Sequence, residues 1–189
     1  MSKEFDKQLL NTIIIQVVKE TFKKLLRIEP VSEPVAMERD IIEFDGHMRV
    51  FPMEKFNGPV LIACVNFFRT QKDLDDDAAV GAFIMFIKED LAEKLLKAFD
   101  RPLKDGDNEE SLLDNTADFC SLLAGNLKKE LVSSGYADLL ISPPSKYKNT
   151  VPDGVPFDYE LYHKQEIPFH FWNQKSVVIE ACMGYVPQK

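Results

Sequence analysis

The spacing of hydrophobic residues divides the chain into helical and extended segments. Between residues 4 and 27, apolar side chains recur at steps of three and four residues, which is the period of a helix with one buried face. The same period predicts a helix over 89–99 and a longer one over about 109–132. Pro30 and Pro102 follow the first two segments and favour helix ends there. We therefore expect three helices, of which the third is the longest.

Segments rich in Val, Ile and Phe predict β-strands between and after these helices. Two of them, 60–68 and 79–87, flank the polar run TQKDLDDD, which is typical of a hairpin turn. The other predicted strands are short and lie near 48–51, 137–141, 157–162, 167–172 and 177–183. The order of elements predicts an α+β fold with a mostly antiparallel sheet packed against long helices, in a single domain over residues 1–189.

Charge and composition narrow the functional classes. The 31 acidic and 23 basic residues give a formal net charge of -8, which repels nucleic acid phosphates, so we expect no nucleic acid partner. Cys64, Cys120 and Cys182 have apolar neighbours and no CxxC spacing, which is typical of buried thiols in a reducing compartment. No apolar run approaches the roughly 18 residues of a membrane span, and the start MSKEFDKQ is unlike a signal peptide. We expect a cytoplasmic protein without membrane contact.

Common cofactor and metal motifs do not fit this sequence. None of the glycines forms GxGxxG or GxxxxGK[ST], so no glycine-rich loop is available for a nucleotide phosphate. The acids of the 73–77 run alternate like calcium ligands, but Ala78 stands where that loop needs Gly. His47, His163 and His170 share no ligand spacing. We expect no metal and no cofactor of its own, while a Ser-His-Asp or Cys-His site stays open because sequence spacing does not test it.

The longest predicted helix carries a second stripe of residues beside its apolar one. Steps of four and three residues join Asp114, Asp118, Ser121, Gly125 and Lys128. One interpretation is the polar flank of an amphipathic helix. Gly125 fits that interpretation poorly, because a glycine inside a helix costs about 1 kcal/mol relative to alanine and usually marks close approach by another backbone. We expect the acids and the Ser121 hydroxyl to be accessible to solvent on one face.

This helix resembles the motif of the CheC/CheX/FliY group of chemotaxis phosphatases, and the chain is most similar to CheX. The family places for Asp or Ser, Glu, Asn and Pro are taken here by Asp114, Asp118, Ser121 and Pro144. Twenty-two residues separate Ser121 from Pro144, as in the family motif. An Ala-Gly-Asn step that includes Gly125 follows, and lysines come after it. Asp118 and Ser121 are departures from the family Glu and Asn.

The resemblance implies a CheX-like, pseudo-duplicated fold and structural roles for Gly125 and Pro144. The first predicted helix then holds a vestige of the repeated motif. Its members are Glu4, Gln8, Asn11 and Pro34, with the same spacing before the proline. Gln8 cannot supply a carboxylate, so this copy would not carry the family chemistry.

The resemblance also implies a function in two-component signalling. The family hydrolyses the aspartyl phosphate of a CheY-like response regulator by positioning a water, and the Mg²⁺ belongs to the regulator. Asp118 would then pair with a regulator lysine and Ser121 would help to orient the water, with Asp114 beside them in the partner-binding surface. A homodimer is expected as well. The alternative is a catalytically inactive binding module, or a dimeric scaffold, in the same signalling system.

Overall fold

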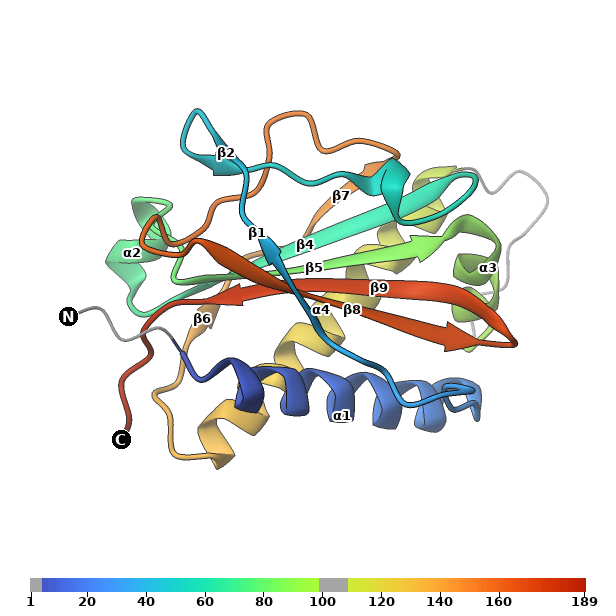
Figure 1. Ribbon diagram of the computed structural model, residues 1–189, viewed down its shortest axis with the longest axis horizontal. Coiled ribbons are helices and arrows are strands. Elements are labelled where there is room, and N and C mark those ends of the chain that lie inside the picture. The colour runs from blue at the N-terminus through green and yellow to red at the C-terminus, as the bar shows by residue number, and fades with distance from the viewer. Residues whose placement is uncertain (1–4, 99–108) are drawn as a thin grey trace.

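A computed structural model describes residues 5–98 and 109–189 and places them around one antiparallel sheet (Figure 1). The strands lie in the order β1-β8-β9-β5-β4-β6, and β7 also pairs with β4. Their bounds are β1 Met37–Asp40, β4 Val60–Phe68, β5 Gly81–Lys88, β6 Leu140–Ile141, β7 Ser145–Lys148, β8 His163–Phe171 and β9 Gln174–Met183. Every pairing in this sheet is antiparallel, as the sequence predicted.

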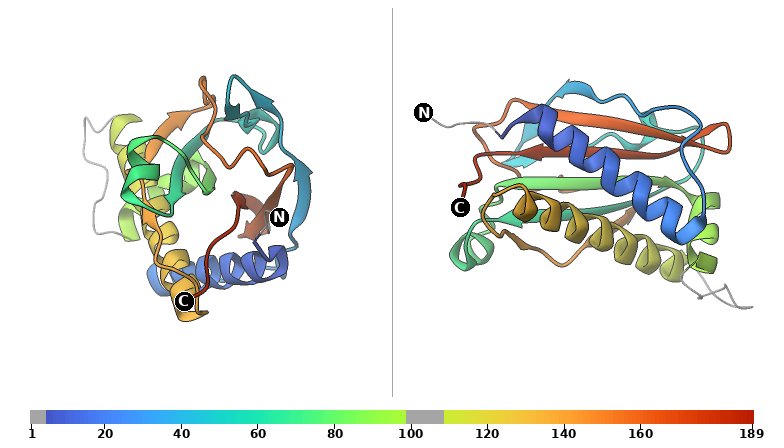
Figure 2. Two further views of the ribbon diagram at one scale, coloured as in Figure 1. Left: turned by 90° about the vertical axis from the view of Figure 1, so that its left-hand side faces the viewer. Right: turned by 90° about the horizontal axis from the view of Figure 1, so that it is seen from below.

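The long helices cover one face of the sheet, and Figure 2 shows α1 and α4 side by side across it. The two long helices are α1 Lys7–Leu26 and α4 Glu109–Ser133, and the shorter α3 spans Glu89–Ala98. The Asp6 carboxylate accepts hydrogen bonds from two amides of the first turn of α1, and Arg27 ends that helix with a positive φ of 56°. The Phe22 ring of α1 stacks on Phe171 of β8 and meets Phe119 of α4 edge-on, which joins three elements in one core.

Loops cover the opposite face of the sheet and enclose a second, smaller core. This layer contains β2 Glu43–Phe44, β3 His47–Met48, the 3-10 turn η1 Pro52–Glu54 and the segment 149–162. Along β4, alternate residues such as Ala63 and Cys64 enter the helix-side and the loop-side core respectively. Because both faces of β4 and β5 are buried, these strands have nearly continuous apolar sequences.

The predicted helices and the central strands are confirmed, but several edge elements differ. The predicted strand 157–162 is wrong: Phe157 is buried in the loop-side core, but the segment forms a turn and pairs with no strand. The expected hairpin turn at 70–77 contains the short helix α2 Gln71–Asp75, because Thr70 and Asp73 form a capping box. The predicted strand 137–141 shortens to β6, and β8 begins four residues before the predicted start.

Some expectations fall outside the described residues or concern absences. Phe99, the connector before Glu109, and Glu4 of the motif vestige are among the residues that are not described. Within the described ranges, no helix combines the length and the apolar character that a membrane crossing requires. In the same part of the chain, His, Cys, Asp and Glu side chains form no cluster of three or more that could hold a metal ion.

Candidate functional site

The polar stripe of α4 lies at the surface, as its spacing predicted. Asp114 and Asp118 are exposed and Ser121 is half-buried. Leu122, beside Ser121, keeps 37% of its surface exposed, which adds an apolar side chain to this face. Within the described residues, the Ser121 hydroxyl has no hydrogen-bond partner. We call the surface made by Asp114, Asp118, Ser121 and Leu122 the α4 face.

The other side of α4 holds the helix firmly on the sheet. The predicted apolar stripe is buried from Ala117 onward, whereas its first member, Leu113, is half-buried. The buried face is also wider than predicted. Its residues are Leu112, Asn115, Thr116, Ala117, Phe119, Cys120, Leu123, Ala124, Leu127 and Leu131. The Cys120 thiol lies 3.5 Å from the Ala63 carbonyl of β4, and burial raises its pKa, so it is a packing group and no nucleophile. The backbone under the α4 face is therefore fixed by core packing.

A lysine from β7 reaches the acidic end of the α4 face. The Lys146 ammonium makes ion pairs with Glu110 and Asp114. The hydrogen bond from Lys146 to Asp114 is the largest cause that raises the pKa of Lys146, and the hydrogen bond to Glu110 is the next largest. Because all three side chains are at least 30% exposed, water and salt weaken these pairs. Asp114 is thus already paired within the chain, through an ion pair that is weak because it is exposed.

Pro144 lies between β6 and β7, two strands that both pair with β4. β6 pairs with the end of β4 and β7 pairs with its beginning, and Pro143 and Pro144 come between them. Proline has no N–H to donate, so the ladder is interrupted there. The chain then resumes pairing at Ser145, opposite Cys64, which brings β7 alongside α4. A structural role for Pro144 near the α4 face fits this position.

Gly125 does not have the environment that was predicted from the sequence. A Cβ atom built at this half-buried position would meet no atom within 4 Å in the described structure, apart from the local helix backbone. The expectation that another backbone of this chain approaches it closely is therefore wrong. The packing of the described residues therefore does not require a glycine at this position.

Asn11, the carboxamide of the motif vestige in α1, contacts the sheet. The Asn11 amide donates to Gln165 of β8 at 3.0 Å, and the Asn11 carbonyl oxygen is buried without a partner. Pro34 is buried too, whereas Gln8 is exposed. The carboxamide of the first copy is thus committed to packing on β8 and does not present a second α4-like face.

Sequence reasoning missed a buried group of charges on the far side of the sheet from α4. Lys55, Lys164 and Glu180 are each less than 9% exposed and bind one another through the Glu180 carboxylate. The one local signal was Glu180 itself, an acid inside the apolar run VVIEACM of β9. Its partner Lys55 is 125 residues away and belongs to a loop, so no periodicity could have joined them.

Comparison with solved structures shows that this fold is shared with chemotaxis proteins. A CheC-like superfamily protein from Shewanella sp. PV-4 aligns with 94% of this chain and 98% of its own, with a TM-score of 0.62 and 13% identity. The chemotaxis protein CheX from Vibrio vulnificus aligns with 92% of this chain and 98% of its own, with a TM-score of 0.55 and 17% identity. A chain of the CheX-CheY-BeF3-Mg complex from Borrelia burgdorferi aligns with 92% of this chain and 97% of its own, with a TM-score of 0.53 and 13% identity.

These likenesses are structural, since no protein-family model matches the sequence and no curated relative was found by sequence. The chain has the CheX and CheC-like fold over nearly its whole length, with mixed helices and antiparallel sheet. At such low identity the comparisons establish the fold, and the activity has to be argued from the residues.

Proposed function

We propose that this protein is a CheX-like signalling protein that docks a phosphorylated CheY-like receiver domain in the cytoplasm through the α4 face. The observation that carries the proposal is the exposure of Asp114, Asp118 and Ser121 along one side of α4, in a fold shared with a CheX that was solved with CheY. The family motif places its reactive residues at these positions.

Docking relies on charge. Asp118 is exposed on the helix between Asp114 and Leu122, so a lysine of the receiver can reach its carboxylate while Leu122 contacts an apolar neighbour. Asp114 adds a second acid on the same side once Lys146 yields to the partner. Charge complementarity of this kind selects the partner and orients it.

The proposed chemistry is hydrolysis of an acyl phosphate by a positioned water. The water oxygen attacks the phosphorus in line with the bond to the receiver aspartate, that bond breaks, and the aspartate carboxylate and inorganic phosphate leave. The Ser121 hydroxyl can accept a hydrogen bond from the water or donate one to the phosphoryl group. This is catalysis by positioning. The Mg²⁺ is the receiver's own, and we propose no cofactor for this chain.

Two shortened side chains make close docking necessary. Asp118 is shorter than the family Glu, Ser121 is shorter than the family Asn, and a misplacement of about 1 Å can cost around a hundredfold in rate. Gly125 lies on the same stripe one turn further along, with open space where a Cβ would be. A receiver that approaches α4 closely enough to touch the Gly125 backbone would bring both short side chains into reach.

A second candidate is binding without hydrolysis. Ser121 favours it, because a half-buried hydroxyl has fewer donors and a shorter reach than a carboxamide. In that case the protein would compete for, or hold, the phosphorylated receiver within the same signalling system.

A timed dephosphorylation assay with receiver domains of the same organism separates the two candidates. The enzyme proposal predicts that the wild-type protein accelerates loss of phosphate and that Ser121→Asn accelerates it further, since the restored amide orients water. Asp118→Ala should weaken both receiver affinity and dephosphorylation rate, because it removes the carboxylate that pairs with the receiver's lysine. Binding without acceleration, followed by activity in Ser121→Asn, would instead identify a binding module with a degenerate site.

Matched variants keep this assay interpretable. Ser133→Asn makes the same exchange at the exposed far end of α4, and Asp75→Ala removes an exposed acid from α2. Neither should change rate or affinity. If no receiver binds, or if Ser121→Asn and Asp118→Ala behave like these controls, the α4 face is no receiver site.

We also propose a homodimer, on a revised basis. Apolar strands such as 157–162 would favour a dimer through sheet edges, but that strand does not exist. One edge of the sheet is β1, whose exposed Glu38, Arg39 and Asp40 discourage strand addition. Large apolar side chains exposed on the loops near β1 offer a different surface; these are Val35, Ile42, Phe44 and Tyr162. Sedimentation at tens of micromolar protein tests the dimer, and a 21.6 kDa species would exclude it at that concentration.

A further inference from the structure

Two pairs of like charges face each other in the sheet on the side away from α4. In the register of β1, β8 and β9, Arg39 lies directly opposite Lys164, and Glu166 lies directly opposite Glu180. Like charges in directly opposed positions repel each other. Lys164 and Glu166 are two residues apart on β8, so both pairs point to the same face. The arrangement needs compensating charge at both pairs.

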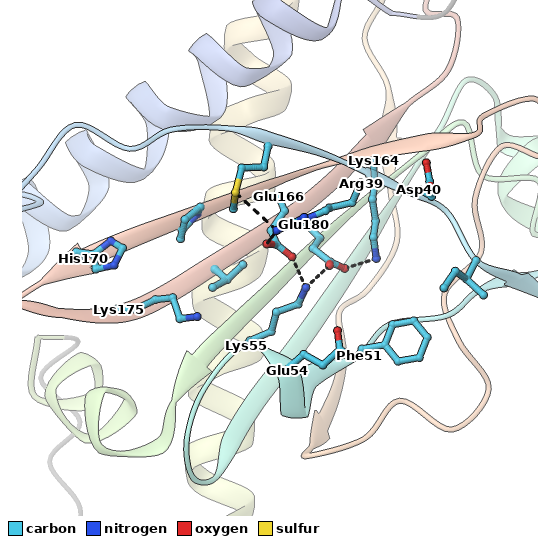
Figure 3. Close-up of a pocket in the computed structure, with 14 residues that line it drawn as sticks. Arg39, Asp40, Phe51, Glu54, Lys55, Lys164, Glu166, His170, Lys175 and Glu180 are labelled. Carbon is cyan, nitrogen blue, oxygen red and sulfur yellow. Dashed lines mark hydrogen bonds and ion pairs between the residues drawn. The ribbon is translucent and has the colours of Figure 1, made fainter.

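Lys55 supplies that charge for the two acids. Its ammonium enters from the loop after η1 and binds Glu180 at 2.6 Å and Glu166 as well (Figure 3). Burial acts to lower the pKa of Lys55, but the charges and hydrogen bonds of Glu180 and Glu166 outweigh it and raise that pKa. Burial likewise acts to raise the pKa of Glu166, but Lys55 and Arg39 lower it overall. The acid pair is therefore bridged by one buried cation.

The opposed cations have no equivalent bridge among the described residues. Lys164 binds Glu180 at 2.7 Å and Arg39 binds Glu166 at 3.3 Å, but no carboxylate lies between them. An ammonium has three N–H donors and a guanidinium five, whereas every oxygen of Glu166 and Glu180 already accepts a bond. The unused hydrogen-bonding capacity of these five side chains is thus mainly for donation.

These cations line a pocket large enough for a small molecule. It has a volume of about 680 Å³ and lies between β1, β8, β9 and the loop that carries Phe51 and Lys55. Ile42, Phe51 and Val178 give it apolar walls. With Asp40, Glu54 and Lys175, four cations and four carboxylates line the pocket. Asp40, Glu54 and Arg39 are exposed, so solvent screens these three more than the buried charges. Lys175 and His170 line the same pocket.

We infer that this pocket binds a small organic carboxylate, with its anionic group between Arg39 and Lys164 and its apolar part against Ile42 and Phe51. The carboxylate does for the two cations what Lys55 does for the two acids. Inorganic phosphate has no apolar part to contact Ile42 and Phe51, which favours an organic carboxylate over it. The loop that carries Phe51 and Lys55 lies on the face of the sheet opposite α4 (Figure 1), so the inference does not depend on receiver binding.

A nuclear magnetic resonance titration with a charged probe and its neutral analogue tests this inference. Phenylacetate should produce saturable shifts in the amides of β1, β8 and residues 51–55, with a Kd of about 1 mM for a ligand of this size. Phenylacetamide has the same shape without the charge, and it should bind at least about tenfold more weakly because it lacks the charge-assisted hydrogen bonds. Inorganic phosphate at equal concentration should also be weaker.

Variants assign the effect to the cation pair. Arg39→Gln, at a largely exposed edge position that should tolerate it, should weaken phenylacetate about tenfold, and Arg39→Lys should retain most of the affinity. Lys72→Gln on α2 should bind like the wild type. Equal binding of acid and amide, no saturable shift, tighter binding of phosphate, or no effect of Arg39→Gln would each overturn the inference. So would shifts that follow protein concentration instead of probe, since a second copy would then occupy the pocket.

Discussion

Gly125→Ala is the most informative single change, because the fold offers no reason for a glycine there. The residue lies inside α4, and an added Cβ would meet nothing within 4 Å outside the local helix backbone. Alanine in a helix interior is favoured over glycine by about 1 kcal/mol, chiefly because the unfolded chain loses freedom. The free energy of unfolding should therefore rise by about 0.5–1 kcal/mol, and the melting temperature by about 1–4 °C for a chain of this size.

Urea denaturation followed by circular dichroism measures this gain. Gly81→Ala is the matched control, since a Cβ there would lie 2.8 Å from the Cys182 carbonyl oxygen and 2.6 Å from the Met183 sulfur. It should lower the free energy of unfolding by about 1–3 kcal/mol, as overpacking does. A loss of stability in Gly125→Ala would refute the reasoning, because it would mean that the position is crowded.

The same variant connects stability to docking. If a receiver approaches the Gly125 backbone closely, the added methyl group should weaken receiver binding even though it stabilises the free protein. Opposite signs for the two effects would locate the reason for the glycine in a partner. Unchanged receiver affinity in a stabilised Gly125→Ala would remove Gly125 from the proposed docking surface.

Three further outcomes are expected. The pKa of Glu166 is lowered in the folded state, so its contribution to stability is present above the ordinary value of 4.5 and is lost as pH falls through the folded pKa. Glu166→Gln should therefore make the free energy of unfolding depend less on pH in that range, as acid unfolding would measure. The buried cysteines, including Cys182 with its pKa raised to about 12, should resist a thiol reagent at pH 8 until denaturant exposes all three, and fast labelling of the native protein would contradict the burial. Lys146→Gln should strengthen receiver binding by a few-fold at most, because it frees Asp114 from an exposed ion pair that solvent already weakens. Weaker binding would show that Lys146 belongs to the docking surface.

The parts of this molecule that follow from local periodicity could be predicted. α4 and its polar stripe depend only on the helical repeat, which places Asp114, Asp118 and Ser121 on one side whatever the rest of the chain does. The strands β4 and β5 are apolar throughout because both of their faces are buried, and an apolar run of that length is a strong local signal. The candidate site was therefore visible before its surroundings were.

Other elements depend on partners far along the chain. Phe157 is apolar, as buried strand residues are, and it packs in the loop-side core. Its backbone pairs with no strand, because burial of a side chain does not require a hydrogen-bonded ladder. β1 and β7 are polar and short, and they are strands only because β8 and β4 offer them free edges. Local sequence carries no record of which edges remain free.

The sequence by itself determined the helical repeat of α4, the antiparallel α+β class and the line of residues on the α4 face. Only the tertiary structure decided that Lys146 reaches Asp114, that Gly125 is open, and that Lys55 lies between Glu166 and Glu180. The physical reason is range: a helical stripe is set by residues three and four apart, whereas a buried charge is stable only when a distant partner is brought to it by the packing of the whole sheet.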